Sequence, residues 1–124
     1  MRTVGEIMSR DVITVGESTT LGEVARAMRA KDAMVALVLD RFGDVVGLIT
    51  DRELVDAIAA SRHPDHGTAQ SFMRRDFVVI PSQSSLDDAD SMMRAGSFRE
   101  LPVMDAGKLV GIVAAGDLAV QAAL

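Results

Sequence analysis

"VVGLITDREL", residues 45–54, is an apolar run that ends at Thr50 in a polar and charged step. The pattern returns as "LVGIVAAGDL" at residues 109–118, where Ala114 stands in place of the threonine and an aspartate in place of the glutamate. The same order of apolar, glycine and acidic positions indicates an internal repeat. The question is whether each of these two steps binds a ligand or only starts a helix.

The repeat extends over nearly the whole chain. An offset of 65 positions aligns Met8 with Met73, and an offset of 64 after the following turn aligns Gly47 with Gly111. Each repeat is too small to close a hydrophobic core alone, so we expect the pair to form one module. The predicted organisation is repeat one at residues 1–62, a linker at 63–67 and repeat two at 68–124.

The periodicity changes in the same order within both repeats. A short β segment precedes an amphipathic helix, and a β-hairpin and a second helix follow. Thr20 with Glu23 and, in the second repeat, Ser85 are expected to cap the first helix, which Gly96 suits as a left-handed end. The order predicts an α/β (α+β) fold of two β-α-β-β-α units. Their β segments are expected at 11–15 and 76–80, and their second helices at 51–60 and 116–123.

Composition excludes several functional classes. The 124 residues include no cysteine, which rules out disulfides and thiolate metal sites and fits a reducing compartment. A formal net charge of −5 argues against nucleic-acid binding. The longest apolar run, 33–39, is far shorter than the ~20 residues that span a bilayer, and the amino terminus does not resemble a signal peptide. We therefore expect a cytoplasmic protein with no membrane segment.

Several motifs together closely resemble those of the cystathionine-β-synthase (CBS) domain family. They are "RELPV" at 99–103, "IMSRDVITV" and "FMRRDFVVI" at the starts of the repeats, and the glycine-to-acid step at 47–54 and 111–118. The resemblance implies a Bateman module, in which two repeats pack through their sheets with pseudo-twofold symmetry. It also implies two clefts that in many members bind an adenosyl compound such as AMP, ATP or S-adenosylmethionine, and a homodimer.

The resemblance also implies site residues. In the family, a hydroxyl residue after the last strand faces the phosphate, and an acid three positions later binds the ribose hydroxyls. The adenine lies against the first strand and the "LPV" strand. The positions that match here are Thr50 and Glu53 in repeat one, Asp117 in repeat two, and the apolar residues Val79, Ile80, Pro81, Leu101 and Pro102. Arg52 and Arg99 are candidate phosphate ligands.

Neither repeat carries the whole signature. Glu53 is one methylene longer than the usual aspartate, Leu37 replaces a proline that the family often has, and Ala114 offers no hydroxyl. Thr50 and Glu53 also have the spacing of a capping box, which needs no ligand. Asp117 is open to a helix-cap role or to ribose binding, and Arg99 to a surface ion pair. We expect any ligand to prefer the cleft served by Asp117.

The linker motif "HPDH", residues 63–66, places His63, Asp65 and His66 close together, but no fourth metal ligand is evident nearby. We expect a solvated linker and no metal. No catalytic constellation is visible, so the chain is not expected to be an enzyme and requires no cofactor. The leading hypothesis is a regulatory module that senses AMP, ADP, ATP or S-adenosylmethionine as a homodimer. The alternative is a ligand-free interaction scaffold with degenerate clefts.

Overall fold

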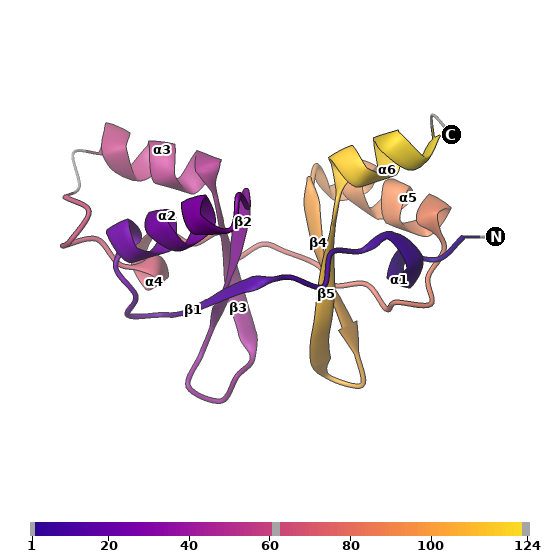
Figure 1. Cartoon of the computed structure of the whole chain (residues 1–124), viewed down its shortest axis with the longest axis horizontal. Helices are drawn as coiled ribbons and strands as arrows, with labels where there is room; N and C mark the ends of the chain where they lie inside the picture. The colour runs from indigo at the N-terminus through magenta and orange to yellow at the C-terminus, as the bar shows by residue number, and fades with distance from the viewer. Residues whose placement is uncertain (1, 61–62, 123–124) are drawn as a thin grey trace. The chain divides into compact units, whose positions relative to one another are not determined.

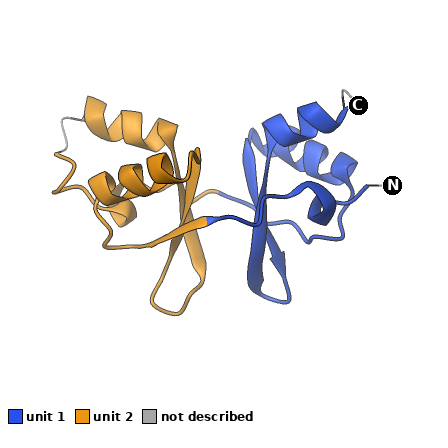
Figure 2. Cartoon of the chain, in the orientation of Figure 1, with its two compact units in different colours: residues 1–12, 77–124 blue, residues 13–76 orange. Residues whose placement is uncertain are grey.

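The computed structural model describes residues 2–60 and 63–122, which fall into two compact units. Unit 1 joins Met1–Val12 to Phe77–Leu124, and unit 2 is Ile13–Asp76 (Figure 2). Both are mixed α and β, as the sequence predicts. No helix among the described residues is long and apolar enough to cross a membrane.

Unit 2 is a three-stranded sheet covered by helices (Figure 1). Its elements are β1 (Ile13–Gly16), α2 (Leu21–Ala30), β2 (Val35–Leu39), β3 (Val45–Thr50), α3 (Asp51–Ala59) and α4 (Ala69–Phe72). β1 pairs in parallel with β2, and β2 pairs antiparallel with β3. Val24 and Met28 of α2 pack on Ala36, Val38 and Ile49 of the sheet, so one apolar helix stripe and one strand face form the core.

Unit 1 repeats this plan around the antiparallel hairpin β4–β5. Its elements are α1 (Val4–Ile7), α5 (Leu86–Gly96), β4 (Glu100–Asp105), β5 (Lys108–Ala114) and α6 (Ala115–Ala122). Met93 of α5 and Leu118 of α6 pack with Leu101, Val103 and Val113 of the hairpin. The predicted hairpin and second helix are therefore confirmed in both units.

The β segment predicted at 76–80 is reduced to a single residue. Ile80 forms one parallel bridge to Val103: its amide donates to the Pro102 carbonyl, and the Met104 amide donates to the Ile80 carbonyl, both at 3.0 Å. The next parallel bond toward the amino end would need the Pro102 amide proton, which proline lacks. Leu37, at the equivalent position of β2, has that proton, and β1 is a full strand.

The opening segment of each repeat packs in the unit formed by most of the other repeat. In unit 1, the amides of Val4 and Gly5 donate to the carbonyls of Ser84 and Ser82, both at 2.8 Å. In unit 2, the backbones of Arg74 and Leu48 exchange two hydrogen bonds of 2.8 and 2.9 Å. The compact units therefore have different boundaries from the sequence repeats.

The predicted helix starts are confirmed, and one helix end is corrected. The Glu23 carboxylate accepts bonds from the amide and the hydroxyl of Thr20, which lowers the Glu23 pKa, and the Ser85 hydroxyl accepts from the Asp88 amide. The left-handed residue after α5 is Ser97, with φ 56°, and not Gly96. Gly96 is the last helical residue, where a β-carbon would collide with the Phe98 ring.

The segment 63–67 is docked on α2. The Leu21 and Gly22 amides, in the first turn of α2, donate to the carbonyls of Gly67 and Pro64, both at 3.0 Å. Amides of the first helical turn have no partner within the helix, so these carbonyls satisfy two of them. The expected linker is thus a turn that supports α2.

Candidate functional site

In unit 2, the step from β3 into α3 is a closed capping box. Oε1 of Glu53 accepts from the amide and from the hydroxyl of Thr50, each at 2.8 Å. The same hydroxyl accepts from the Arg52 amide at 3.2 Å. The hydroxyl proton and one oxygen of the carboxylate are therefore committed to starting the helix, as the capping hypothesis predicts. The Arg52 side chain points to solvent, 80% exposed, and its Nε lies 3.4 Å from a carboxylate oxygen of Asp56.

In unit 1, the step from β5 into α6 is more open. Asp117 is exposed, and its Oδ2 accepts one bond of 3.3 Å from the Ala114 amide. Ala114 has no hydroxyl, so this bond is only the backbone half of a capping box. A carboxylate offers about four acceptor positions, so Asp117 retains most of its capacity for a ligand.

Arg99 lies beside this helix start. The Ala115 amide donates to the Arg99 carbonyl at 2.8 Å, and the next residue, Glu100, is the strand partner of Ala114. The Arg99 side chain is exposed. The structure therefore brings Arg99 and Asp117 to the same end of the β4–β5 hairpin.

The apolar residues predicted to contact the adenine differ in how far they are buried. The side chains of Ile80 and Leu101 belong to the unit 1 core, and the amide and carbonyl of Ile80 are already bonded to Pro102 and Met104. Pro102 pairs with Ile112 and, by strand alternation, faces the opposite side of the sheet from Leu101. Val79, 42% exposed, and the exposed Pro81 flank Ile80 on either side.

The segment after Pro81 is fixed by a side chain of the hairpin. The hydroxyl and the amide of Ser82 donate to the Asp105 carboxylate at 2.6 and 2.9 Å. These bonds hold the pKa of Asp105 below its usual 3.8. They hold the segment around Ser82 against β4, beyond the single bridge between Ile80 and Val103.

Unit 1 also contains a cavity of about 500 Å³ that the sequence did not reveal. Its apolar lining, at α5 and α6, consists of Leu86, Met93, Phe98, Ala115, Leu118, Ala119 and Ala122. Charged and polar lining residues are Arg2, Asp87, Asp90, Arg94 and Gln121. None of the predicted site residues lines it. The one signal in the sequence is the series of alanines in α6 where α3 has larger residues.

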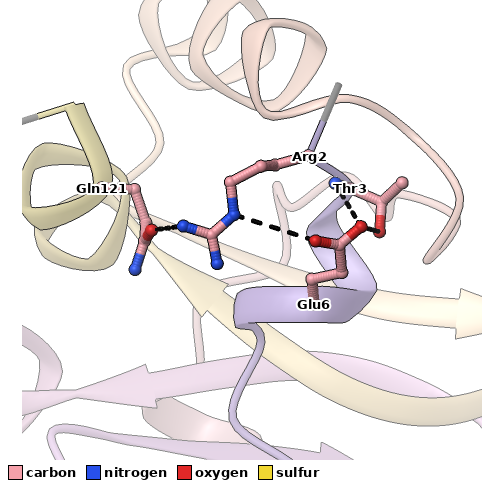
Figure 3. Close-up of polar contacts among 4 residues, drawn as sticks. All are labelled: Arg2, Thr3, Glu6 and Gln121. Carbon is pink, nitrogen blue, oxygen red and sulfur yellow. Dashed lines mark hydrogen bonds and ion pairs between the residues drawn. The ribbon is translucent and has the colours of Figure 1, made fainter. Parts of the chain in front are cut away.

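Arg2 links the amino-terminal segment to Gln121 of α6 (Figure 3), and both residues line the cavity. Its Nη1 donates to Oε1 of Gln121, and its Nε lies 3.8 Å from the Glu6 carboxylate. Glu6 in turn accepts from the amide of Thr3 at 3.4 Å and from its hydroxyl at 3.3 Å. The first residues of the chain thus contact the last described helix.

No group of three or more histidine, aspartate or glutamate side chains in the described ranges 2–60 and 63–122 is arranged to hold a metal. In the "HPDH" turn, the His63 and His66 rings lie 5.0 Å apart, and Nδ1 of His63 is 3.9 Å from the Asp65 carboxylate. His63 Nδ1 also accepts from the Asp65 amide at 3.2 Å.

Comparison with known proteins relates this geometry to a family. A family model described as the CBS domain matches residues 4–60 and 69–122. The chain is 32% identical over 121 residues to the CBS domain-containing protein YhcV of Bacillus subtilis, covering 98% of this chain and 86% of that protein. Some curated relatives are longer, and the chain spans 60% of one from Methanopyrus kandleri.

Solved structures give the same result. A CBS-domain containing protein from Agrobacterium tumefaciens is 32% identical, with a TM-score of 0.86 over 98% of this chain and 93% of that chain. CBSX2, solved in complex with AMP, is 25% identical, with a TM-score of 0.79 over 99% of this chain and 97% of that chain.

Proposed function

Since the chain belongs to the CBS domain family, we propose that it is a regulatory module that binds an adenosyl compound and acts as a homodimer. Two CBS domains account for nearly all of the described residues, and the relatives carry CBS-domain names, so this pair of domains is not an enzyme. The AMP complex of CBSX2 supports the choice of ligand class. Regulation then requires that the ligand bind one arrangement of the homodimer more tightly than another.

The difference between the two helix starts is the observation that carries the choice of site. In unit 2, the Glu53 carboxylate accepts hydrogen bonds of 2.8 Å from the Thr50 amide and hydroxyl. In unit 1, the exposed Asp117 carboxylate accepts one hydrogen bond, of 3.3 Å. Two adjacent ribose hydroxyls need an acceptor that is free and at fixed reach, and a carboxylate can take both protons. We therefore place the ribose at Asp117 in unit 1.

The rest of the ligand follows from this position. The exposed Arg99 side chain starts from the same end of the hairpin and is the available cation for a phosphate. Ala114 offers no hydroxyl, so little besides Arg99 and backbone amides would hold the phosphate. The base would lie toward Val79 and Pro81, the exposed apolar residues on either side of Ile80. A ligand with a single phosphate, or with none, fits these residues better than a triphosphate.

A ligand-free interaction scaffold is the second candidate, and two observations favour it. The closed capping box occupies one carboxylate oxygen of Glu53 in unit 2, and unit 1 has Ala114 where the family has a hydroxyl residue. In this case the homodimer surface alone would be the function.

Calorimetric titration distinguishes the two candidates. AMP, ADP, ATP and S-adenosylmethionine are titrated into the protein, with GMP as a control that keeps the ribose and phosphate but changes the base. The proposal expects saturable binding of at least one adenosyl compound and weaker binding of GMP. Heat of dilution alone with all four adenosyl compounds would contradict the proposal and favour the scaffold.

A further inference from the structure

The segment Arg2–Gly5 is attached at both ends within unit 1. Toward α1, Val4 is fully buried in the core, and its amide donates to the Ser84 carbonyl at 2.8 Å. At the other end, Nη1 of Arg2 donates to Oε1 of Gln121, in the last turn of α6 (Figure 3). The two residues of this bond are 119 positions apart in the sequence, so a short segment joins the core of unit 1 to α6.

The Arg2 side chain is oriented by a second contact. Its Nε lies 3.8 Å from the Glu6 carboxylate, which also accepts from the amide and the hydroxyl of Thr3 at 3.4 and 3.3 Å (Figure 3). A side chain that is already restricted loses less conformational entropy when it forms a further bond. The guanidinium is therefore preorganised to bind Gln121.

Few side chains of α6 hold this helix against the core. Leu118 is the one buried residue of Ala115–Ala122, and the alanines of the helix line the cavity of about 500 Å³. Atoms that line an unfilled cavity lack the contacts of a packed core, so we expect α6 to open locally at low cost. Among the residues that the structure describes, the bond from Arg2 is the one side-chain hydrogen bond between residues 119–122 and another part of the chain.

We propose that the segment Arg2–Gly5 is a strap that holds α6 in the position in which Asp117 binds its ligand. Asp117 and Gln121 lie one helical turn apart on the same side of α6. The helix has eight residues, about two turns, so a bond that fixes Gln121 also limits the movement of Asp117. The inference rests on the adenosyl ligand proposed above and adds what regulates its site.

The coupling between strap and ligand acts in both directions. When α6 is displaced in some of the molecules, the apparent affinity at Asp117 falls by the fraction that remains in position. Conversely, a ligand that binds the strapped position strengthens the attachment of the strap by the same factor. The amides of Val4 and Gly5 report this attachment, because both donate hydrogen bonds to the backbone of residues 82–84.

Hydrogen exchange followed by NMR on the ligand-free protein tests the strap. In Arg2→Ala, the amides of residues 119–122 should exchange at least about fivefold faster than in wild type, since local opening becomes easier. Arg94→Ala is the matched control: Arg94 lines the same cavity but pairs with Asp90 of its own helix at 2.9 Å, and the change in α6 should stay below about twofold. The amides of residues 55–59, in α3 of unit 2, should not change in either variant.

A second variant shows whether the effect passes through the bond itself. Gln121→Ala should accelerate exchange as Arg2→Ala does, and the double variant should add nothing further, because both substitutions remove the same interaction. Exchange of α6 at the wild-type rate in Arg2→Ala would overturn the strap, whether or not a ligand binds. Additive effects of the two substitutions would overturn it as well.

Calorimetric titration with AMP separates failure of the coupling from failure of the proposed function. Arg2→Ala should bind AMP about three- to tenfold more weakly than wild type, and Arg94→Ala should stay within about twofold. AMP should also slow the exchange of the Val4 and Gly5 amides in wild type. Equal affinity of Arg2→Ala and wild type would contradict the coupling alone. A wild-type protein that does not bind AMP would contradict the proposed ligand and the coupling together, while the exchange experiment still decides the strap.

Discussion

Met73 occupies the space in which any residue larger than glycine at position 47 would carry its β-carbon. A β-carbon built on Gly47 lies 2.5 Å from the sulfur of Met73. The equivalent relationship in unit 1 joins Gly111 to Met8, with a sulfur distance of 2.6 Å. In both units the glycine of the last strand therefore admits the methionine that opens the other repeat, which explains why both "VVGLI" and "LVGIV" contain glycine.

We expect Gly111→Ala to destabilise the protein more than Gly47→Ala. A β-carbon at Gly111 also lies 2.8 Å from the Ser9 carbonyl oxygen, which is held by its bond with the Ile112 amide, whereas the crowding atoms at Gly47 all belong to the Met73 side chain. Overpacking typically costs about 1–3 kcal/mol, and Gly111 should lie at the upper end. The free energy of unfolding in urea measures both variants.

Gly116→Ala is the matched control, because a β-carbon on this exposed helical glycine has nothing within 4 Å. It should raise stability by about 0.5–1 kcal/mol through helix propensity. Equal losses at positions 47 and 111, or a larger loss at 47, would show that the Ser9 backbone yields more readily than the geometry implies.

The sequence predicted those features that depend on local chemistry or on the repeat itself. The capping residues Thr20 and Thr50 act as their spacing indicated, because a capping box involves only neighbours along the chain. The exchange of Met8 and Met73 between the sequence repeats was not predictable, because both repeats have the same pattern and nothing local indicates which sheet each methionine packs on.

Other differences have equally specific causes. The strand at 76–80 was lost because Pro102 removes one hydrogen bond of a neighbouring strand, a long-range effect. Gly96 was interpreted as a left-handed residue, but its lack of a side chain instead leaves room for the Phe98 ring. The cavity was missed because alanines in a helix look like ordinary core positions until the size of the opposing surface is known.

The Ser82–Asp105 contact predicts a pH dependence. The pKa of Asp105 is lowered by the Ser82 hydroxyl and amide, so its contribution to stability is present above about pH 4 and is lost as pH falls through the lowered pKa. Ser82→Ala should raise the pKa of Asp105 toward 3.8. The stability difference between wild type and variant should then be largest at neutral pH and narrow toward pH 2, as roughly expected from linkage.

Carboxyl chemical shifts followed by NMR during an acid titration measure this pKa directly. Ser84→Ala serves as the control, since within residues 2–60 and 63–122 Ser84 forms hydrogen bonds through its backbone carbonyl and amide and none through its hydroxyl. An Asp105 pKa that does not move in Ser82→Ala would contradict the assigned cause.

Metal removal should leave the protein unchanged. His63, Asp65 and His66 form a turn that supports α2 through the carbonyls of Pro64 and Gly67, and this role needs no ion. We expect EDTA to alter neither the melting temperature nor the binding of an adenosyl compound. A clear fall in melting temperature that added zinc reverses would refute this prediction.

The central claim is that an adenosyl ligand binds at Asp117, and the most direct measurement compares two acidic variants by calorimetric titration. Asp117→Ala should weaken binding by about 1.5–3 kcal/mol, roughly ten- to hundredfold in Kd, since it removes hydrogen bonds to a charged acceptor. Glu53→Ala should leave the Kd within about twofold and instead lower stability by about 0.5–2 kcal/mol, since it opens the capping box at Thr50. If Glu53→Ala abolishes binding while Asp117→Ala binds like wild type, the ligand site has been assigned to the wrong unit.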